Sequence, residues 1–457
     1  MLLPEIDKAL GIEVYATETP GIGGAIRQAI DDFTVEEILV DGSRAKIEKT
    51  VDSLALRTTL TKQSFLLCVL VKRNWDTFIA IKNIARQLGI SQERIGIAGI
   101  KDAKAVTAQY ITIKQGAIED MAGINVRDVE IRPVGYFHEE LSPYYLLGNN
   151  FSIIIRAIKL ASSTIPKRLA ATVRELDAMG GIPNFFGHQR FGTTRPITHL
   201  VGKAIVEGDF ERAALLYLAQ PSVHEHPWSR QARWKLQSTQ DFREAFQDFP
   251  KPLRYERLML AHLVEKPEDF VGAFRRLPLK LQGLFVQAYQ SYLFNRFLSE
   301  RIRNGFSLAR AEVGDYVVST ERSGLPMIRT GKTVTVDSLA DVNDAIRTGK
   351  VQVALPLVGE RQRQSKGAMG QLEMQVLEAE GVRAEAFKVD VFPQISVRGG
   401  LRSIVSPIKD FGVHDVSKGD NVKGNQAALD FMLLRGSYAT VLLREIMKPK
   451  NPINAGF

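Results

Sequence analysis

The chain has 457 residues, of which 45% are hydrophobic and 24% are charged. This usage excludes a fibrous or disordered chain and leaves room for two or three separately cored domains. No segment reaches the run of about 18 apolar residues that a membrane span requires, and the N-terminal sequence lacks the basic region and apolar core of a signal peptide. We therefore expect a soluble, cytoplasmic protein with no membrane partner.

The charge balance favours a polyanionic partner. The formal net charge is +9 and the sequence pI is near 9.4, which raises the expectation of nucleic-acid binding without establishing it. The single cysteine, Cys68, stands in the apolar run 65–71, so it is predicted to be a small buried hydrophobe. Thiol chemistry and an internal disulfide are not expected.

The first elements alternate between strands and helices. A strand is predicted over 32–40, and it places Glu37 on the same face as Phe33, Val35 and Leu39. The simplest interpretation is an edge strand with one solvated carboxylate. A helix is predicted over 78–88, where Phe78, Ile81, Ala85 and Leu88 follow helical spacing, with Thr77 as its cap and Gly89 closing its end.

Two extended segments come next, over 95–100 and 106–113, with the polar residues 101–104 between them. This order places Asp102 on a loop between strands. The pattern Lys101-Asp102-x-Lys104 sets a carboxylate between two cations, which favours its ionised form and suits it to act as a nucleophile or base. Taken alone, such a cluster is far more often a solvated group of surface charges.

Later segments change in character. A helix is predicted from Thr164 to Gly180, and the segment 184–192 is too rich in glycine for a regular helix. Longer helical patterns follow, the clearest over 281–302, with strand-like pieces at 314–320 and 351–356. The end returns to a mixed pattern, with the segment 427–434, a break at Gly436-Ser437 and a helix over 438–447.

The segment GIAGIKDAKAVTAQ at 96–109 resembles the catalytic motif of the TruD-type tRNA pseudouridine synthases, in particular archaeal-like members. Further landmarks of that family occur in the same order: DFxVxE at 32–37, GNxF at 148–151, NxFGxQRFG at 184–192 and RGSYATxLxRE at 435–445. The resemblance covers about residues 20 to 448 and is weakest in the middle, where QAYQSYLFN at 287–295 carries it.

This resemblance implies an α+β fold. A catalytic domain on a pseudouridine-synthase-type mixed β-sheet, residues 1–195 and 393–457, would be interrupted by a large inserted α/β (TRUD) domain, residues 196–392. It also implies an enzyme of the isomerase class that converts uridine to pseudouridine in tRNA, typically at position thirteen. Asp102 would be the nucleophile, although the sequence leaves open whether it attacks the base or the ribose.

The resemblance and the chemistry together predict the substrate-binding residues. A base that leaves its stack needs an aromatic surface, for which Phe33 and Phe151 match family positions, although either ring could be core. Asn149 would share one side of its strand with Phe151 and offer hydrogen bonds. The remaining expectations are phosphate contacts from Lys101 and Lys104, a phosphate or Asp-orienting contact from Arg190, and a cation-positioning or surface role for Glu37.

Cofactors are not expected. His224-x-His226 lacks a third nearby metal ligand, and Gly21-x-Gly23-Gly24 follows a proline and not a strand, so neither a metal nor a nucleotide cofactor is predicted. The aromatic residues Phe285, Tyr289, Tyr292 and Phe297 recur at helical spacing, which is more typical of core than of a stacking surface.

Two other functions stay open: a non-catalytic RNA-binding or folding factor, and an RNA methyltransferase, for which no glycine-rich loop after a strand is found. Basic residues in both proposed domains, such as Arg190, Arg275, Arg276 and Lys423, predict that RNA lies between the domains. The sequence does not determine the oligomeric state.

Overall fold

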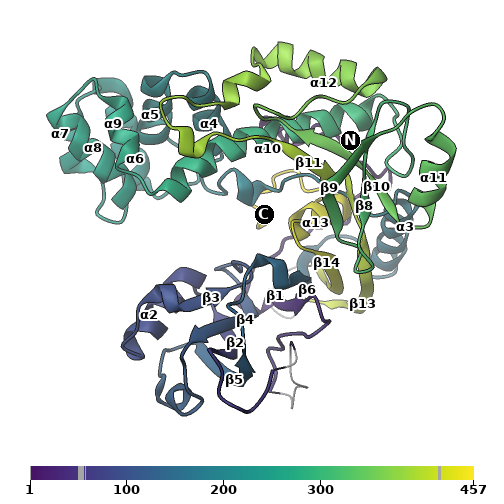
Figure 1. Ribbon diagram of the computed structural model, residues 1–457, viewed down its shortest axis with the longest axis horizontal. Helices are drawn as coiled ribbons and strands as arrows, with labels where there is room; N and C mark the ends of the chain where they lie inside the picture. The colour runs from purple at the N-terminus through teal and green to yellow at the C-terminus, as the bar shows by residue number, and fades with distance from the viewer. Residues whose placement is uncertain (1, 50–55, 57, 420–423) are drawn as a thin grey trace.

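The computed structural model describes residues 2–49, 56, 58–419 and 424–457. Its helices and strands form an α+β fold, as predicted, with an eight-stranded mixed sheet, a four-stranded sheet and a helical bundle (Figure 1). Among the described residues, no helix combines the length and apolarity that crossing a bilayer requires. Lys423, one of the basic residues predicted to face RNA, lies outside the described residues.

The eight-stranded sheet is built from the two ends of the sequence. Its order is β13-β14-β6-β1-β4-β2-β5, with β3 paired to β4. The strands are β1 (Phe33–Leu39), β2 (Phe65–Arg73), β3 (Ile95–Ile97), β4 (Val106–Lys114), β5 (Val129–Phe137), β6 (Leu146–Ile158), β13 (Ile408–Lys418) and β14 (Asn425–Leu434). β1 and β4 run parallel, whereas the other pairs are antiparallel.

β1 lies between β4 and β6 in the middle of this sheet, so the prediction of an edge strand was wrong. The alternation along the strand is real, because Phe33, Val35, Glu37 and Leu39 are all buried. Glu37 has no exposed surface at all, since residues far along the chain cover and pair it. Periodicity finds the inward face but not the neighbouring strands.

A second sheet has the order β11-β10-β8-β9. It is formed by β8 (Tyr316–Thr320), β9 (Pro326–Thr333), β10 (Val351–Leu357) and β11 (Gly400–Ser403), and a two-stranded ribbon joins β7 (Ile182–Pro183) to β12 (Val405–Ser406). Helices α11 (Leu339–Arg347) and α12 (Gly367–Glu380) accompany this sheet. The domain division stays a prediction, but the pairing of β11 with β10 argues for a second boundary after residue 403.

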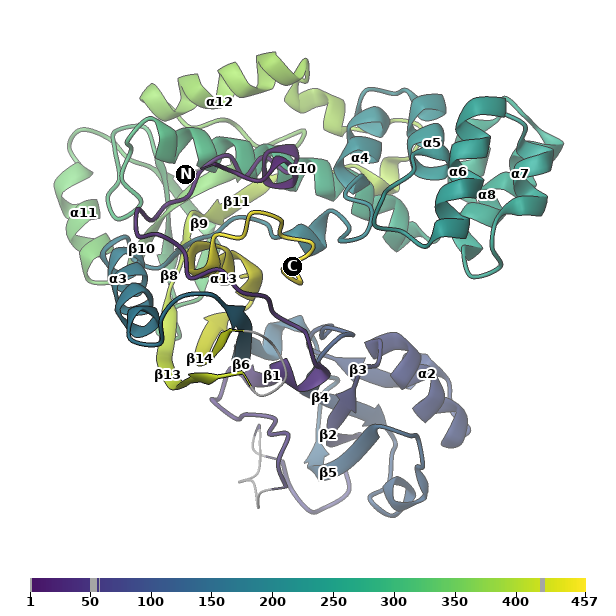
Figure 2. The same ribbon diagram turned by 180° about the vertical axis from the view of Figure 1, so that it is seen from behind.

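The helical bundle projects from one side of the molecule. It contains α4 (Thr198–Val206), α5 (Phe210–Ala219), α6 (Pro227–Thr239), α7 (Phe242–Asp248), α8 (Arg254–Glu265) and α9 (Phe270–Arg275), and it leads into the long α10 (Leu279–Arg303). In Figures 1 and 2 the bundle and the part of the eight-stranded sheet beside α2 project to the same side, one above the other. Phe285, Tyr289 and Phe297 of α10 are buried, as expected for core.

The remaining helices are α1 (Glu5–Ala9), α2 (Thr77–Gln87), α3 (Thr164–Ala178) and α13 (Ala439–Met447). The cap of α2 is Asp76, whose carboxylate accepts hydrogen bonds from the backbone N–H groups of Phe78 and Ile79, and not Thr77 as predicted. The buried face of α2 is shifted as well, because Phe78 is 51% exposed whereas Ile81 and Ala85 are buried.

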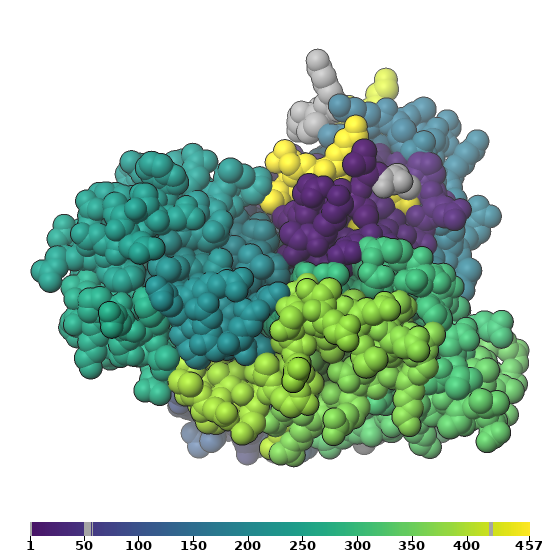
Figure 3. All heavy atoms as spheres, turned by 90° about the horizontal axis from the view of Figure 1, so that it is seen from above, coloured from purple at the N-terminus to yellow at the C-terminus, as the bar shows by residue number. Residues whose placement is uncertain are grey.

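One large hydrophobic core joins the two ends of the chain to both sheets and the bundle, from Leu10 to Phe457. Two smaller clusters, which include Val69 in one and Cys68 in the other, pack around β2 and β4. Burial raises the pKa of the Cys68 thiol, which agrees with the predicted structural role. In Figure 3 the N-terminal residues, in purple, lie beside the C-terminal residues, in yellow.

Candidate active site

Asp102 lies on the loop between β3 and β4, as predicted, and neighbouring elements hold the backbone of this loop. The amide of Gln109 in β4 donates to the carbonyl of Gly99 over 3.0 Å. The hydroxyl of Thr77 lies 3.2 Å from both the N–H and the carbonyl of Lys101. The Asp102 side chain itself stays 37% exposed. The loop is therefore fixed by its backbone while its carboxylate remains accessible.

Lys72 of β2 supports the same loop from beneath. Its buried ammonium donates to the carbonyls of Asp102 and Trp75, each at 2.7 Å, and to that of Lys101 at 3.4 Å. Burial lowers the pKa of Lys72 to about 8, although the negative charges of Asp102 and Asp76 act in the opposite direction. A positive charge is thus held directly under the backbone of Asp102.

Arg27 is the side-chain partner of Asp102, with Nη2 lying 3.5 Å from Oδ1. Its guanidinium also stacks over the ring of Phe33, 4.1 Å from the centroid, and donates from Nη1 to the carbonyl of Gly456 over 2.9 Å. Burial lowers the pKa of Arg27 while the charge of Asp102 raises it, and an arginine stays protonated under such conditions. The carboxylate therefore faces a fixed cation.

Arg27, Lys72 and Gly456 were not found by sequence reasoning. They lie outside the motif around Asp102 and meet it only through the fold. Arg27 is distinctive in the structure, where its backbone has a positive φ of 56°. This angle cannot be read from the sequence, so the sequence carried no signal for Arg27.

Lys101 was predicted to contact a phosphate, but its side chain points into the protein. Its Nζ lies 2.5 Å from Oε1 of Glu37, and both side chains are almost fully buried. The other Glu37 oxygen accepts the backbone N–H of Tyr110 over 2.9 Å. Glu37 does position a cation, and is not a surface residue, whereas Lys101 is engaged inside the protein. Lys104, by contrast, is exposed.

A cavity of about 980 Å³ opens in front of Asp102. Its wall comes from parts of the chain that are distant in sequence, among them residues around Arg27 and Phe33, the Asp102 loop, β6, the 189–194 segment, and the C-terminal residues. The lining includes Phe33, Lys101, Asp102, Lys104, Asn149, Phe151, Gln189, Thr193, Thr194, His224, Tyr438, Thr440, Gly456 and Phe457. A cavity of this size matches the range of small-ligand sites.

Two predicted site residues, Phe151 and Asn149, meet on β6 at this cavity. The Phe151 ring packs edge-on to Phe33 at 6.2 Å and stacks on Phe431 at 5.3 Å, so both predicted aromatic rings belong to the core as well as to the cavity wall. The side-chain oxygen of Asn149 is buried and has no hydrogen-bond partner among the described residues. An unpaired buried acceptor at a cavity wall is a candidate contact for a ligand N–H group.

Arg190 does not line this cavity. Its guanidinium bonds to Ser291 and Gln287 of α10, at 3.1 and 3.3 Å, and no hydrogen bond or ion pair joins it to Asp102 within the described part of the chain. Arg275 and Arg276 are exposed, but Arg275 lies over the ring of Phe392 and Arg276 bonds to His262.

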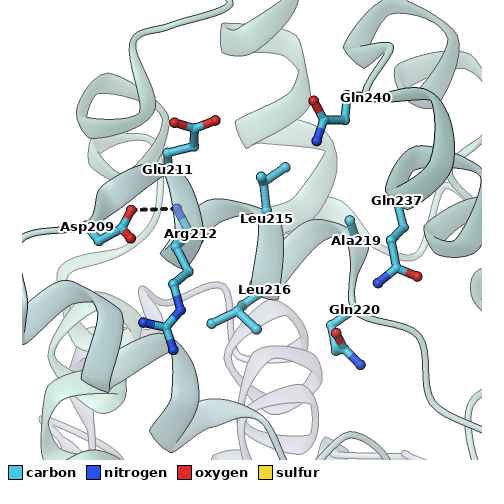
Figure 4. Close-up of a pocket in the computed structure, with 9 residues that line it drawn as sticks. All are labelled: Asp209, Glu211, Arg212, Leu215, Leu216, Ala219, Gln220, Gln237 and Gln240. Atoms are coloured by element: carbon cyan, nitrogen blue, oxygen red, sulfur yellow. Dashed lines mark hydrogen bonds between the residues drawn. The ribbon is translucent and has the colours of Figure 1, made fainter.

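Other hollows offer less chemistry. One of about 380 Å³ lies between α5 and α6, where Asp209 caps α5 through the N–H of Arg212 and the remaining lining is leucine, alanine, glutamine and one glutamate (Figure 4). In the residues that the structure describes, no group of three or more His, Cys, Asp or Glu side chains is placed to hold a metal ion.

Comparison with known proteins gives one consistent result. The family model described as "tRNA pseudouridine synthase D (TruD)" matches residues 9–446. A "Probable tRNA pseudouridine synthase D" of Methanosarcina mazei is 39% identical over 99% of both chains, and one of Thermococcus onnurineus is 37% identical over 95% of this chain and 97% of its own.

A solved crystal structure from Methanosarcina mazei, of a protein that carries the name tRNA pseudouridine synthase D (TruD), superposes with a TM-score of 0.83. It is 38% identical in sequence, and the match covers 99% of this chain and 100% of the other. The predicted family is thereby confirmed, and the chain belongs to the tRNA pseudouridine synthase D family.

Proposed function

We propose that this protein isomerises uridine to pseudouridine in tRNA, at position thirteen, with Asp102 as the nucleophile. The observation that carries the proposal is the accessible Asp102 carboxylate, paired with Arg27, at the wall of a cavity large enough for a nucleoside. The relatives' names supply the substrate class. The position in the tRNA rests on the resemblance of the Asp102 motif to that of the family.

The reaction requires no change of oxidation state. The bond between N1 of uracil and C1′ of ribose breaks, the uracil turns, a bond forms between C5 and C1′, and the proton displaced from C5 is balanced by one gained at N1. Asp102 provides a negative oxygen that attacks a carbon of the base or of the ribose and leaves again. An isomerisation of this kind needs no cofactor, so we assign none.

The other predicted residues receive roles that follow from where they lie. The edge of Phe151 borders the flipped base, and the unpaired oxygen of Asn149 accepts the N–H of the uracil ring. Lys104 is exposed at the rim and contacts a flanking phosphate. Lys101 and Glu37 act as positioning residues, because their buried ion pair anchors the loop. Arg190 orders the 184–192 segment against α10.

We further propose that the middle of the chain, with its helical bundle and second sheet, grips the RNA while the eight-stranded sheet carries the chemistry. The two parts project to the same side of the molecule, and the cavity of Asp102 lies where residues 189–194 meet the catalytic loop. Removal of the middle segment is expected to cost RNA affinity. Normal binding and site preference in a folded deletion variant would refute this division of labour.

The decisive experiment replaces Asp102 by asparagine. Asp102→Asn keeps the shape of the side chain but removes its charge and nucleophilicity, so pseudouridine formation is expected to vanish in single-turnover assays with an unmodified tRNA transcript. Affinity for the RNA is expected to persist or to rise slightly, because a negative charge near phosphates is gone. Appreciable product from a verified, folded Asp102→Asn protein would refute the assignment.

Lys104→Ala is the matched control, because Lys104 stands two residues away on the same loop. It is expected to weaken RNA binding more than it slows the chemical step. The alternative, a non-catalytic RNA-binding factor, predicts instead that the wild-type protein binds the transcript and yields no pseudouridine without any added cofactor.

A further inference from the structure

A second hollow lies beside the Asp102 cavity on the helical bundle, and we call it the α6 hollow. It has a volume of about 430 Å³ and is lined by Pro221, Ser222, Val223, Pro227, Arg230, Gln231 and Trp234. Two of its side chains are large, apolar and strongly exposed, since Val223 is 75% and Trp234 is 63% accessible. An accessible indole and an accessible valine that line the same hollow form an apolar surface of the kind found at binding sites.

The α6 hollow is continuous with the wall of the Asp102 cavity. Ser222 and Val223 line the α6 hollow, whereas the next residue, His224, lines the cavity of Asp102. The hydroxyl of Ser222 donates to the carbonyl of Thr194 over 2.7 Å, and Thr194 is also part of the Asp102 cavity wall. A strand of RNA with one nucleotide in the Asp102 cavity would therefore cross residues 222–224 to reach Trp234.

Two of the three basic side chains of α6 are paired with carboxylates, and the third, Arg230, lines this hollow. Arg233 is buried and bonds to Glu225 and Glu256, and Lys235 pairs with Glu244 and Asp248. The guanidinium of Arg230, one helical turn from Trp234, forms no hydrogen bond or ion pair within the described part of the chain, and no carboxylate lines the hollow. The available partners are thus an aromatic face and a positive charge, which suit a base and its phosphate.

We propose that the α6 hollow binds an unpaired nucleotide of the RNA substrate adjacent to the target uridine, with its base against Trp234 and its phosphate at Arg230. The inference rests on the proposed function, because it takes the RNA to occupy the Asp102 cavity. Stacking on an indole accepts any base, so this contact contributes affinity and places the target nucleotide, whereas it does not read sequence.

Intrinsic fluorescence gives a direct test, because the chain has 3 tryptophans, Trp75, Trp228 and Trp234. A protein with Trp75→Phe, Trp228→Phe and Asp102→Asn keeps Trp234 as its only indole and does not turn over. Titration with unmodified tRNA transcript is expected to quench its emission in a saturable manner. A protein that binds the transcript, as measured by filter retention, without any change in Trp234 emission would overturn the proposal.

The kinetic test uses Trp228 as the matched control, since it is 73% exposed on the same helix but does not line the hollow. Trp234→Ala is expected to raise KM for the transcript about tenfold at unchanged kcat, and Trp234→Phe to restore most of the loss. Trp228→Ala is expected to leave both constants unchanged. Wild-type KM in Trp234→Ala refutes the hollow as an RNA site and leaves the proposed function intact, whereas absence of pseudouridine in the wild-type protein refutes that function.

Discussion

Lys72 shows how one buried side chain can link pH to the geometry of the Asp102 loop. Its ammonium has three N–H groups, and three backbone carbonyls of the loop region surround it. Because burial lowers the pKa of Lys72 to about 8, the group loses its proton close to physiological pH. The neutral amine has only two N–H groups, so one carbonyl then lacks a donor.

We expect kcat to fall as the pH rises through about 8, and Lys72→Met to have a low kcat without this alkaline decrease. Loss of folded protein through deprotonation of Lys72 is not the cause of this decrease in kcat. The folded-state pKa lies below the ordinary 10.5, so the unfolded chain binds more protons between pH 8 and 10.5 and this lysine makes stability rise with pH there. Single-turnover rates and Tm measured from pH 6.5 to 10 separate the two effects, and a rate that is flat across pH 8 would contradict the prediction.

The sequence indicates Asp102 itself, because a carboxylate between two lysines on an interstrand loop is visible in the local pattern. It does not indicate what each cation does. Lys101 turns inward to Glu37, and the cation that pairs with Asp102 is Arg27, which arrives from a segment distant in sequence. Side-chain direction on an irregular loop depends on tertiary contacts that periodicity does not encode.

The C-terminal segment is a structural part of the candidate site. Ile26 donates its N–H to the carbonyl of Ala455 over 2.9 Å, and Gly456 accepts from Arg27. Gly456 has a φ of 91°, and a Cβ there would lie 2.3 Å from the carbonyl oxygen of Ile26. Any larger residue must push the segment away from Arg27.

Gly456→Ala is therefore expected to lower kcat about 10- to 100-fold through displacement of the partner of Asp102. Gly42→Ala is the control, because Gly42 has a similar φ of 88° but nothing within 4 Å of the added Cβ. Both variants carry the same type of backbone strain, of about 1 kcal/mol or more. Equal activity in the two variants would remove the C-terminal segment from the catalytic arrangement.

Glu373 of α12 is a buried carboxylate whose pKa burial raises to about 7, although hydrogen bonds from Ser365 oppose the shift. The folded state therefore holds this proton more tightly than the unfolded chain, whose value is near 4.5, so stability falls as pH rises from about 4.5 to about 7. Glu373→Gln is expected to be more stable than wild type at pH 8, by up to about 3 kcal/mol, and equal to it near pH 4. Urea unfolding at the two pH values checks this, and a constant difference between them would contradict it.

Elements with a strong local signal could be predicted. The helices α10 and α13 and the strand β4 lie within a few residues of their predicted ranges. The exposure of Phe78 in α2 and the central position of β1 could not be predicted from the sequence. Both features depend on which distant segments pack against these elements. Hydrophobic spacing defines a face, and the fold decides what packs on it.

For the whole molecule, the net charge of +9 predicts binding dominated by phosphate contacts. The logarithm of tRNA affinity is expected to fall linearly with the logarithm of salt concentration, and Arg230→Gln to reduce the slope by about one. Fluorescence anisotropy between 50 and 300 mM salt measures both. A slope near zero would mean that apolar contacts hold the RNA and that the basic surface has another role.

The assembly of the Asp102 cavity also has a temporal consequence. Its wall combines residues near position 26 with residues 453–457, which the ribosome adds after the strands of the eight-stranded sheet. A nascent chain can fold β1 to β6 and expose Asp102, yet it lacks the carbonyl that holds Arg27 until residue 456 has left the exit tunnel. A chain that ends before residue 456 is therefore expected to lack this contact of Arg27 and, under the proposed function, to be inactive even where its sheet has folded.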